Sequence, residues 1–203
     1  MDGAGRGNLE VFSARGGRSR RRPVTSSSAA APDEAPEGLG LAAFNALPNP
    51  RARELLRDCC PAVHWAAAVA DGRPYGSMEE LLARAHTELT GEDVAEALAG
   101  HPRIGDAPAA GQSSRSRSEQ AGVDGADGTV RAELAAGNRA YEERFGHIYL
   151  VCASGRSAQE LLSILQDRLR NDPAAERQAV RAELGKINDL RLARLMGACE
   201  RAS

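Results

Sequence analysis

The stretch NDPAAERQAVRAELGKINDLRLARL, residues 171–195, decides the fold class. Asp172 followed by Pro173 is typical of a helix start, because Asp accepts hydrogen bonds from free backbone N–H groups and Pro fits the first helical position. Beyond this start, apolar residues recur at helical spacing, at Val180, Leu184, Ile187, Leu190 and Leu195. The stretch is therefore predicted to be a long helix with one buried face.

Helix starts and stops of this kind recur through most of the chain. Starts are predicted at Asn49–Pro50, Ser77 with Glu80, Thr90, Thr129, and Ser157 with Glu160. Gly100 is expected to end a helix in the left-handed conformation that glycine adopts readily, and Gly146 is expected to stop another helix. Aromatic residues make up only 3% of the chain, which favours close-packed helices over a sheet. The predicted fold class is all-α, with a single compact multi-helix domain over residues 41–203.

Two segments depart from the helical pattern. Residues 1–40 include GRSRRRPVTSSSAAAPDEAPEG, which has no periodic apolar face, so we expect a disordered tail. Its arginine cluster is not expected to begin a signal peptide, because the residues that follow are too polar. HIYLVCA, residues 147–153, is a short continuous apolar run. Because a lone strand is unstable, we expect an extended or helical piece buried between helices.

Composition argues against several kinds of partner and site. The net charge of −2 gives no reason to expect a nucleic acid or a membrane surface as partner, and no apolar run approaches the roughly 20 residues that cross a bilayer. The cysteines match no zinc-binding spacing, and His101 shares no metal-ligand spacing with the other histidines. We therefore expect no metal, and we expect free buried thiols in a reducing compartment at Cys59, Cys60, Cys152 and Cys199.

His101, in GHPRIG at residues 100–105, is the first candidate catalytic side chain. Gly100 before it and Pro102 after it should place the imidazole on a stiff, extended corner at the end of a helix. A histidine with a fixed direction suits general acid/base chemistry, because its ordinary pKa of about 6.5 lies near working pH. The alternative is a protonated histidine that only interacts with the negative end of the helix dipole.

Two further polar features have both a structural and a ligand-binding interpretation. Ser116 and Glu119, in SRSEQ, have the spacing of a helix capping box, which leaves Gln120 unexplained. A Ser/Glu/Gln cluster at a helix start could instead bind a polar ligand. Arg191 lies next to apolar positions, so it either pairs with a carboxylate of the protein or of a ligand, or reaches out to solvent.

Taken together and in this order, these motifs resemble the pattern of the OHCU decarboxylase family. The pattern consists of HPRIG, then Ser-x-x-Glu-Gln, then Asn-x-x-Tyr-x-x-x-Phe-Gly before the apolar run, and finally RLRND and LRLARL. The resemblance spans residues 41–197 and includes the stretch RPYGSMEELLARA. The family converts 2-oxo-4-hydroxy-4-carboxy-5-ureidoimidazoline (OHCU), a small molecule, to (S)-allantoin in urate breakdown. The resemblance therefore implies a decarboxylase.

The resemblance also implies a role for each matching position. His101 would be the catalytic histidine and Glu119 its partner carboxylate. Substrate binding would involve the side chains or backbone of Pro102, Ser116, Gln120, Ile148 and Arg191. No cofactor is expected, because the substrate's own C=N bond can accept the electron pair released with CO₂. Relatives are often dimers, so we expect a homodimer, and we expect it in the bacterial cytoplasm.

The sequence departs from the family pattern at two places. HPRIG replaces the HPDLAG form of other branches, and His147 stands where an aromatic residue is common. Both changes could alter the shape of the pocket, and neither removes a group with an implied catalytic role.

Two other functions compete with the decarboxylase interpretation. One is a non-catalytic, all-helical binding or regulatory module, whose arginine-rich tail would contact nucleic acid. The near-neutral helical body and the absence of a basic recognition helix in the sequence argue against it. The other is a metal-dependent hydrolase that would use His101, Asp106 and Glu119, and it predicts bound metal and inhibition by a chelator.

Overall fold

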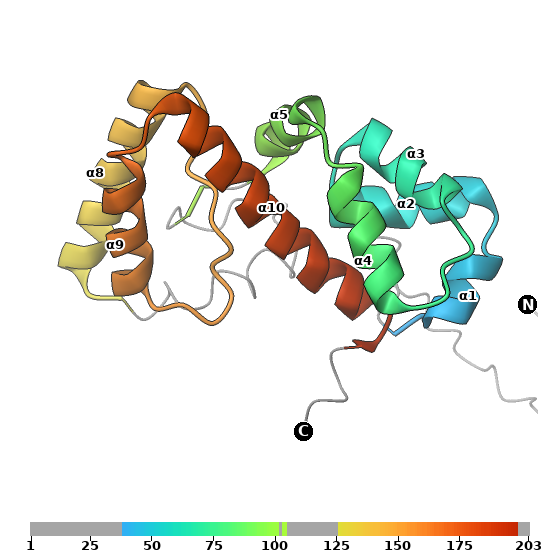
Figure 1. Cartoon of the computed structure of the whole chain (residues 1–203). Helices are drawn as coiled ribbons and strands as arrows, with labels where there is room; N and C mark the ends of the chain where they lie inside the picture. Colours follow the sequence, from blue (N-terminus) through green and yellow to red (C-terminus); the bar gives the residue numbers. More distant parts are fainter. Residues whose placement is uncertain (1–37, 102, 105–125, 199–203) are drawn as a thin grey trace, which may run out of the picture. The chain divides into compact units, whose positions relative to one another are not determined.

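All the regular secondary structure that the computed structural model describes is helical (Figure 1). The model describes residues 38–101, 103–104 and 126–198. The eight helices within these ranges are α1 (Leu41–Ala46), α2 (Asn49–Cys59), α3 (Val63–Asp71), α4 (Met78–Thr87), α5 (Gly91–Gly100), α8 (Gly128–Phe145), α9 (Ala158–Arg168) and α10 (Pro173–Leu195). The predicted all-α fold class is confirmed. Residues 1–37 of the predicted tail lie outside the described ranges.

Side-chain caps explain where several helices begin. Ser77, Thr90 and Ser157 each accept a hydrogen bond at the side-chain oxygen from the backbone N–H three residues later. Asp172 accepts from the N–H groups two and three residues later, directly before α10 opens with Pro173. These caps satisfy backbone donors that have no partner within the helix. The four starts are as predicted.

Two other starts differ slightly from the prediction. α2 begins at Asn49 itself, with Pro48 as the flanking residue, so Asn49 is not the cap. α8 begins at Gly128, and Asp127 is its cap, with an oxygen 2.7 Å from the backbone nitrogen of Thr129. No side chain caps α2, whereas at α8 the cap is Asp127, two residues before the predicted start at Thr129.

The predicted left-handed end of α5 is wrong. Gly100 is the last residue of the helix and is not among the glycines with positive φ. α5 ends instead because His101 is extended, with φ −87° and ψ 140°, the conformation that a following proline favours. Gly146 ends α8, as predicted, and it does so in the left-handed conformation, with φ 76°.

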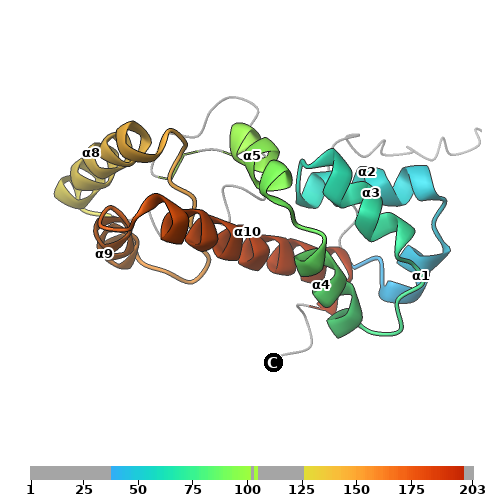
Figure 2. The same cartoon turned by 45° about the horizontal axis from the view of Figure 1, so that its top comes forward.

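Buried apolar side chains form two clusters. The first cluster lies among α1–α5 and α10 and includes Trp65, Leu81 and Leu184. The second cluster lies mainly between α8 and α9 and includes Leu134 and Leu165. Figures 1 and 2 show α8 beside α9, and α10 passing along α4 and α5, with which it packs. The long helix α10 therefore provides one wall of the first cluster.

The segment 147–153 is neither helix nor strand and contacts both clusters. Leu150 and Cys152 belong to the first cluster, whereas Tyr149, Val151 and Ala153 belong to the second. This alternation is what an extended chain produces, because successive side chains point to opposite sides. The expectation of a buried extended piece is confirmed.

Three of the four cysteines, Cys59, Cys60 and Cys152, are free and buried, as predicted, and Cys199 lies outside the described residues. The described part of the chain contains no group of three His, Cys, Asp or Glu side chains placed to hold a metal ion. None of its helices combines the length and the apolar character needed to span a membrane.

Candidate active site

His101 lies at the end of α5, and the backbone fixes the direction of its ring. Its backbone N–H donates to the carbonyl of Leu98 at 3.3 Å, and its ring Nδ1 lies 2.7 Å from the carbonyl oxygen of Ala97. Because a carbonyl can only accept, Nδ1 must carry a proton. In the neutral imidazole, Nε2 then holds the lone pair, so Nε2 is the atom that can act as a base.

This geometry combines both interpretations of His101. The bond to Ala97 is a side-chain contact with the negative end of the helix, as the structural alternative requires. It uses only one ring nitrogen, however, and the other is the one that general acid/base chemistry needs. Since Nδ1 is taken, contact with the Glu119 carboxylate would have to occur at Nε2.

Arg191 lies on the buried face of α10 and contacts the end of α2. Its side chain is buried, and Nη1 donates to the carbonyl oxygen of Cys59 at 2.8 Å. The solvent-facing alternative for Arg191 is therefore wrong. A cation at a helix C-terminus is favourable, since it binds a carbonyl that lacks a partner within the helix. This bond uses one of the five N–H donors of the guanidinium.

The end of α5, which carries His101, and the side chain of Arg191 both meet the segment Cys59–Pro61. A Cβ placed on Gly100 would lie 3.5 Å from Cγ of Pro61, so the end of α5 packs on this segment. Arg191 binds the carbonyl at its first residue. Burial raises the pKa of the Cys60 thiol to about 11, although the amide of Asn188 and the charge of Arg191 oppose this rise. The ends of α2 and α5 and one face of α10 thus form a corner, which we call the 59–61 corner.

Ile148 has a half-buried side chain that packs against the first apolar cluster. Its carbonyl oxygen lies 3.1 Å from Nδ1 of His147, which donates to it. The ring of His147 also stacks on Phe145, at 6.3 Å between centroids, and meets the edge of Tyr141 at 5.5 Å. His147 therefore packs as an aromatic ring would, although it is a departure from the family pattern.

A buried ion pair holds the segment that follows Ile148. Nε of Arg168 donates to Oε1 of Glu176 at 2.8 Å, and Nη1 donates to the carbonyl of Leu150 at 2.5 Å. Tyr141 donates its hydroxyl to the same carboxylate oxygen, and Asn171 donates to the other one at 2.8 Å. We call Tyr141, Arg168 and Glu176 the buried triad.

The buried triad stays charged despite its burial. Burial alone would raise the pKa of Glu176, but hydrogen bonds from Arg168, Tyr141 and Asn171 outweigh it and hold this pKa below its ordinary value. Burial raises the pKa of the Tyr141 hydroxyl, and the hydrogen bond to Glu176 adds to the rise. The triad is thus an anionic carboxylate bound by a cation and a neutral phenol.

The sequence analysis did not identify the triad as a unit. Tyr141, which is buried, appeared there only as the Tyr of the Asn-x-x-Tyr-x-x-x-Phe-Gly motif, and Arg168 only as a letter of RLRND. Its position offered a clue, because it follows Leu161 and Leu165 at helical spacing on a face that is otherwise apolar. A buried arginine requires a carboxylate partner, which the sequence pattern alone does not identify.

Four predicted site residues lie outside the described part of the chain: Pro102, Ser116, Glu119 and Gln120. Asp106, which the rival hydrolase interpretation requires, also lies there. The structure brings His101 and Arg191 to one corner and places Ile148 in the buried extended segment. The pairing of His101 with Glu119 stays a prediction.

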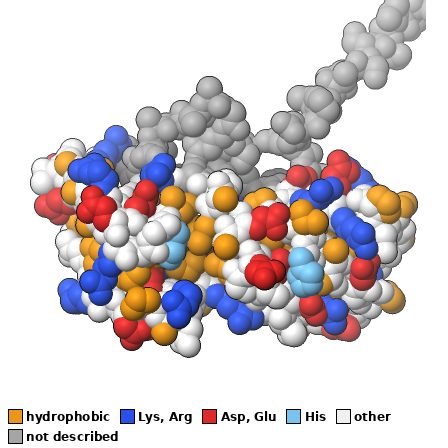
Figure 3. Space-filling view, turned by 90° about the horizontal axis from the view of Figure 1, so that it is seen from above, with side chains coloured by type: hydrophobic (Ala, Val, Ile, Leu, Met, Phe, Trp, Pro, Cys, Tyr) orange, Lys and Arg blue, Asp and Glu red, His pale blue; other side chains and the backbone are white. Residues whose placement is uncertain are grey.

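A separate cavity lies beside this site. Its volume is about 470 Å³, and neither His101 nor Arg191 is among its lining residues, which include Val94, Leu98, His147, Arg177 and Arg181. Figure 3 shows hydrophobic side chains gathered in the middle of the face seen from above, with charged side chains on both sides.

The family model described as OHCU decarboxylase matches residues 45–193 of this chain. A 2-oxo-4-hydroxy-4-carboxy-5-ureidoimidazoline decarboxylase from Amia calva is 32% identical over 151 residues, covering 66% of this chain and 79% of that protein. The Uric acid degradation bifunctional protein TTL of Arabidopsis thaliana is 32% identical over 145 residues, covering 68% of this chain. The match spans only 45% of the Arabidopsis protein's length.

Solved structures show the same similarity. A crystal structure of OHCU decarboxylase in the presence of (S)-allantoin has a TM-score of 0.61 and 30% identity, covering 71% of this chain and 98% of that one. An (S)-allantoin synthase, at 14% identity and a TM-score of 0.59, covers 77% of this chain and 54% of that one, and it supports the fold alone. The match of the family model to most of the chain and the identity to the Amia calva enzyme decide the assignment: this chain belongs to the OHCU decarboxylase family.

Proposed function

We propose that this protein is a cofactor-independent decarboxylase that converts OHCU to (S)-allantoin in the breakdown of urate. The observation that carries the proposal is the 59–61 corner. There a buried arginine binds the carbonyl of Cys59, and the end of α5, which packs on Pro61, carries a histidine whose Nδ1 is held by a backbone carbonyl. A base with a fixed direction and a cation for an anionic or carbonyl group are the two groups that the reaction most needs.

The reaction can be written with its atoms and electrons balanced. The bond between the carboxylate and the hydroxyl-bearing ring carbon breaks, and CO₂ leaves. The electron pair forms a C=C bond to the neighbouring ring carbon, and the π electrons of that carbon's C=N bond move to the nitrogen, which takes a proton from solvent. The hydroxyl then loses its proton and becomes a carbonyl, while the neighbouring carbon gains a proton and becomes the stereocentre of allantoin. The substrate is its own electron sink, so no step needs a cofactor.

The chain's residues would then move and place protons. Nε2 of His101 would take the hydroxyl proton and return it to one face of the neighbouring carbon. The Glu119 carboxylate would face Nε2 and stabilise the imidazolium that forms when Nε2 takes the proton. Arg191 would bind the carboxylate or a ring carbonyl, and Ser116, Gln120 and the backbone at Ile148 would bind the ureido and ring amide groups. Pro102 would shape the wall beside His101.

The test is the handedness of the product. OHCU also decarboxylates without enzyme, so turnover should be followed by circular dichroism of allantoin. We expect enantiopure (S)-allantoin with the protein and a racemate without it. A racemic product at full enzyme loading would exclude the proposed function.

His101→Asn tests the role of the histidine. The Asn amide can still donate to the carbonyl of Ala97, as Nδ1 does, but it offers no atom at the position of Nε2. Acid/base groups commonly contribute about 10²–10⁴-fold, so we expect at least about a hundredfold loss of turnover in a folded protein. Turnover close to that of the wild type would rule out this role.

A cytoplasmic location in a bacterium and a homodimer are further parts of the proposal. The free, buried thiols of Cys59, Cys60 and Cys152 support a reducing compartment. Cell fractionation tests the location, and light scattering of the purified protein tests the dimer, which a monomer mass would contradict.

A further inference from the structure

Asn188 is a buried amide that has no good partner among the residues that the structure describes. It is 2% exposed, and neither its Oδ1 nor its Nδ2 makes a hydrogen bond of normal geometry in the described part of the chain. An asparagine amide offers one acceptor and two donor hydrogens. Buried polar groups are normally hydrogen-bonded, and leaving them unbonded is costly. Asn188 is therefore expected to bind something that the described part of the chain does not supply.

The position of Asn188 indicates what it binds. It lies three residues before Arg191, so the two side chains share one face of α10. The thiol of Cys60 lies against the Asn188 amide, whereas Arg191 binds the carbonyl of Cys59. Asn188 thus belongs to the 59–61 corner. A thiol is a weak donor and a weak acceptor, so Cys60 cannot satisfy a primary amide.

We propose that Asn188 is a substrate-binding residue, whose amide pairs with an N–H and a C=O group of the ring lactam or the ureido substituent. A lactam or a urea presents a donor next to an acceptor, and a primary amide presents the complementary pair in one plane. An aliphatic side chain at this position could fill the space but could not distinguish these groups. The inference rests on the proposed decarboxylase function, and it assigns a substrate contact beyond those that the family resemblance implies.

Asn188→Leu is the informative variant, because leucine has a similar size and no polar atoms. Removing a buried amide without a good partner should leave the melting temperature unchanged or raise it. We expect KM for OHCU and Kd for (S)-allantoin each to rise at least about tenfold, with a smaller change in kcat, the pattern for loss of a contact made in both ground and transition states. Unchanged KM and Kd in a folded variant would overturn the proposal and leave Asn188 a purely structural role.

A control and a second measurement complete the test. Asn138→Leu removes another buried asparagine, which lies on α8 and whose Nδ2 donates to the carbonyl oxygen of Ile104 at 2.8 Å. It should lower the melting temperature, and its effect on KM should be smaller than that of Asn188→Leu. If Asn188→Leu does not fold, a crystal structure of the wild type with (S)-allantoin decides. An Asn188 amide beyond hydrogen-bond distance of the ligand would overturn the proposal.

The decarboxylase function and the role of Asn188 can fail separately. If the wild type makes only racemic allantoin, the proposed function fails. If the wild type makes (S)-allantoin and Asn188→Leu binds substrate and product as well as the wild type does, only the role of Asn188 fails.

Discussion

Replacing Glu176 by alanine should destabilise the protein strongly, by about 3–5 kcal/mol. The side chain of Glu176 is 1% exposed and that of Arg168 is 8% exposed. Glu176→Ala therefore leaves a buried guanidinium without its carboxylate. The loss exceeds the net contribution of the pair to stability, because the remaining charge stays out of water with nothing to compensate it.

The hydrogen bonds of the triad allow a second estimate of this loss. The carboxylate accepts from Arg168, Tyr141 and Asn171. Asn171 is half-exposed and can turn to water, so two buried donors lose their acceptor. At about 1–3 kcal/mol for each unsatisfied donor, the loss is roughly 2–6 kcal/mol, in agreement with the first estimate. For a chain of this length the melting temperature should fall by roughly 6–20 °C.

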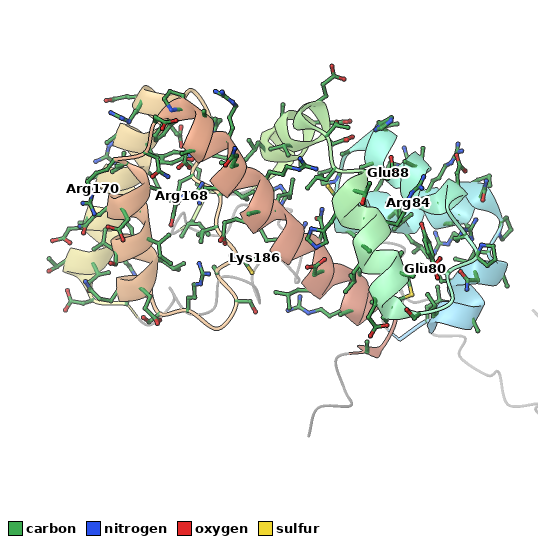
Figure 4. All side chains as sticks on the ribbon, in the orientation of Figure 1. Glu80, Arg84, Glu88, Arg168, Arg170 and Lys186 are labelled. Carbon is green, nitrogen blue, oxygen red and sulfur yellow. The ribbon has the colours of Figure 1, made fainter. Side chains whose placement is uncertain are left out.

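Thermal unfolding followed by far-ultraviolet circular dichroism measures this loss at neutral pH. Asp167→Ala is the matched control, because it breaks an ion pair with Arg170 whose side chains are 65% and 73% exposed. Figure 4 labels Arg170 beside Arg168 at the end of α9. The control should change stability by less than about 1 kcal/mol. If Glu176→Ala and Asp167→Ala lower the melting temperature equally, the triad does not anchor the fold as we argue.

Three further predictions concern single contacts. The folded-state pKa of Glu176 lies below its ordinary value of 4.5, so the contribution of its charge to stability is complete above about pH 4.5 and is lost as pH falls through the lowered value. The free energy of unfolding should therefore fall less steeply with acid in Glu176→Gln than in the wild type. Identical slopes would contradict this. Gly137→Ala should destabilise the protein by about 1 kcal/mol, because the added Cβ would lie 2.6 Å from Cδ2 of the buried Leu165 and this clash outweighs the better helix propensity of alanine. Urea unfolding measures the change in stability, and a stabilised variant would show that Leu165 can move away. Ser157→Ala should cost about 1 kcal/mol in the same assay, because the backbone N–H of Glu160 loses its acceptor and the Glu160 carboxylate loses the hydroxyl donor, while the bond from the backbone N–H of residue 157 remains. A loss near zero would mean that water replaces the cap.

Most of the helical fold could be predicted because helix ends depend on local chemistry. Ser77, Thr90 and Ser157 cap their helices through bonds to groups within three residues, so the sequence contains both partners. Gly146 adopts a left-handed conformation that depends on its own backbone alone. The burial of segment 147–153 was predictable from its continuous apolar run, whereas the sequence left open whether the segment is extended or helical.

The interactions that stabilise the site could not be predicted, because their partners are distant in sequence. Arg191 binds a carbonyl 132 positions away, and Tyr141 donates to a carboxylate 35 positions away. Asn188 looks like any polar residue of α10 until its burial is known. The error at Gly100 has a local origin: the extended conformation of His101 was enough to end α5, and the left-handed glycine was not needed.

Backbone carbonyls help to fix the directions of the two candidate active-site groups that the structure describes. The last carbonyls of a helix have no partner within it. His101 binds one of these carbonyls at Ala97 on α5, and Arg191 binds another at Cys59 on α2. Each bond uses one nitrogen of a side chain that has others, so a group fixed in direction can still offer an atom to a ligand. Because these acceptors are main-chain atoms, no single side-chain substitution removes either anchor. Variants of neighbouring side chains should therefore change substrate binding more readily than they change the direction of His101 or Arg191.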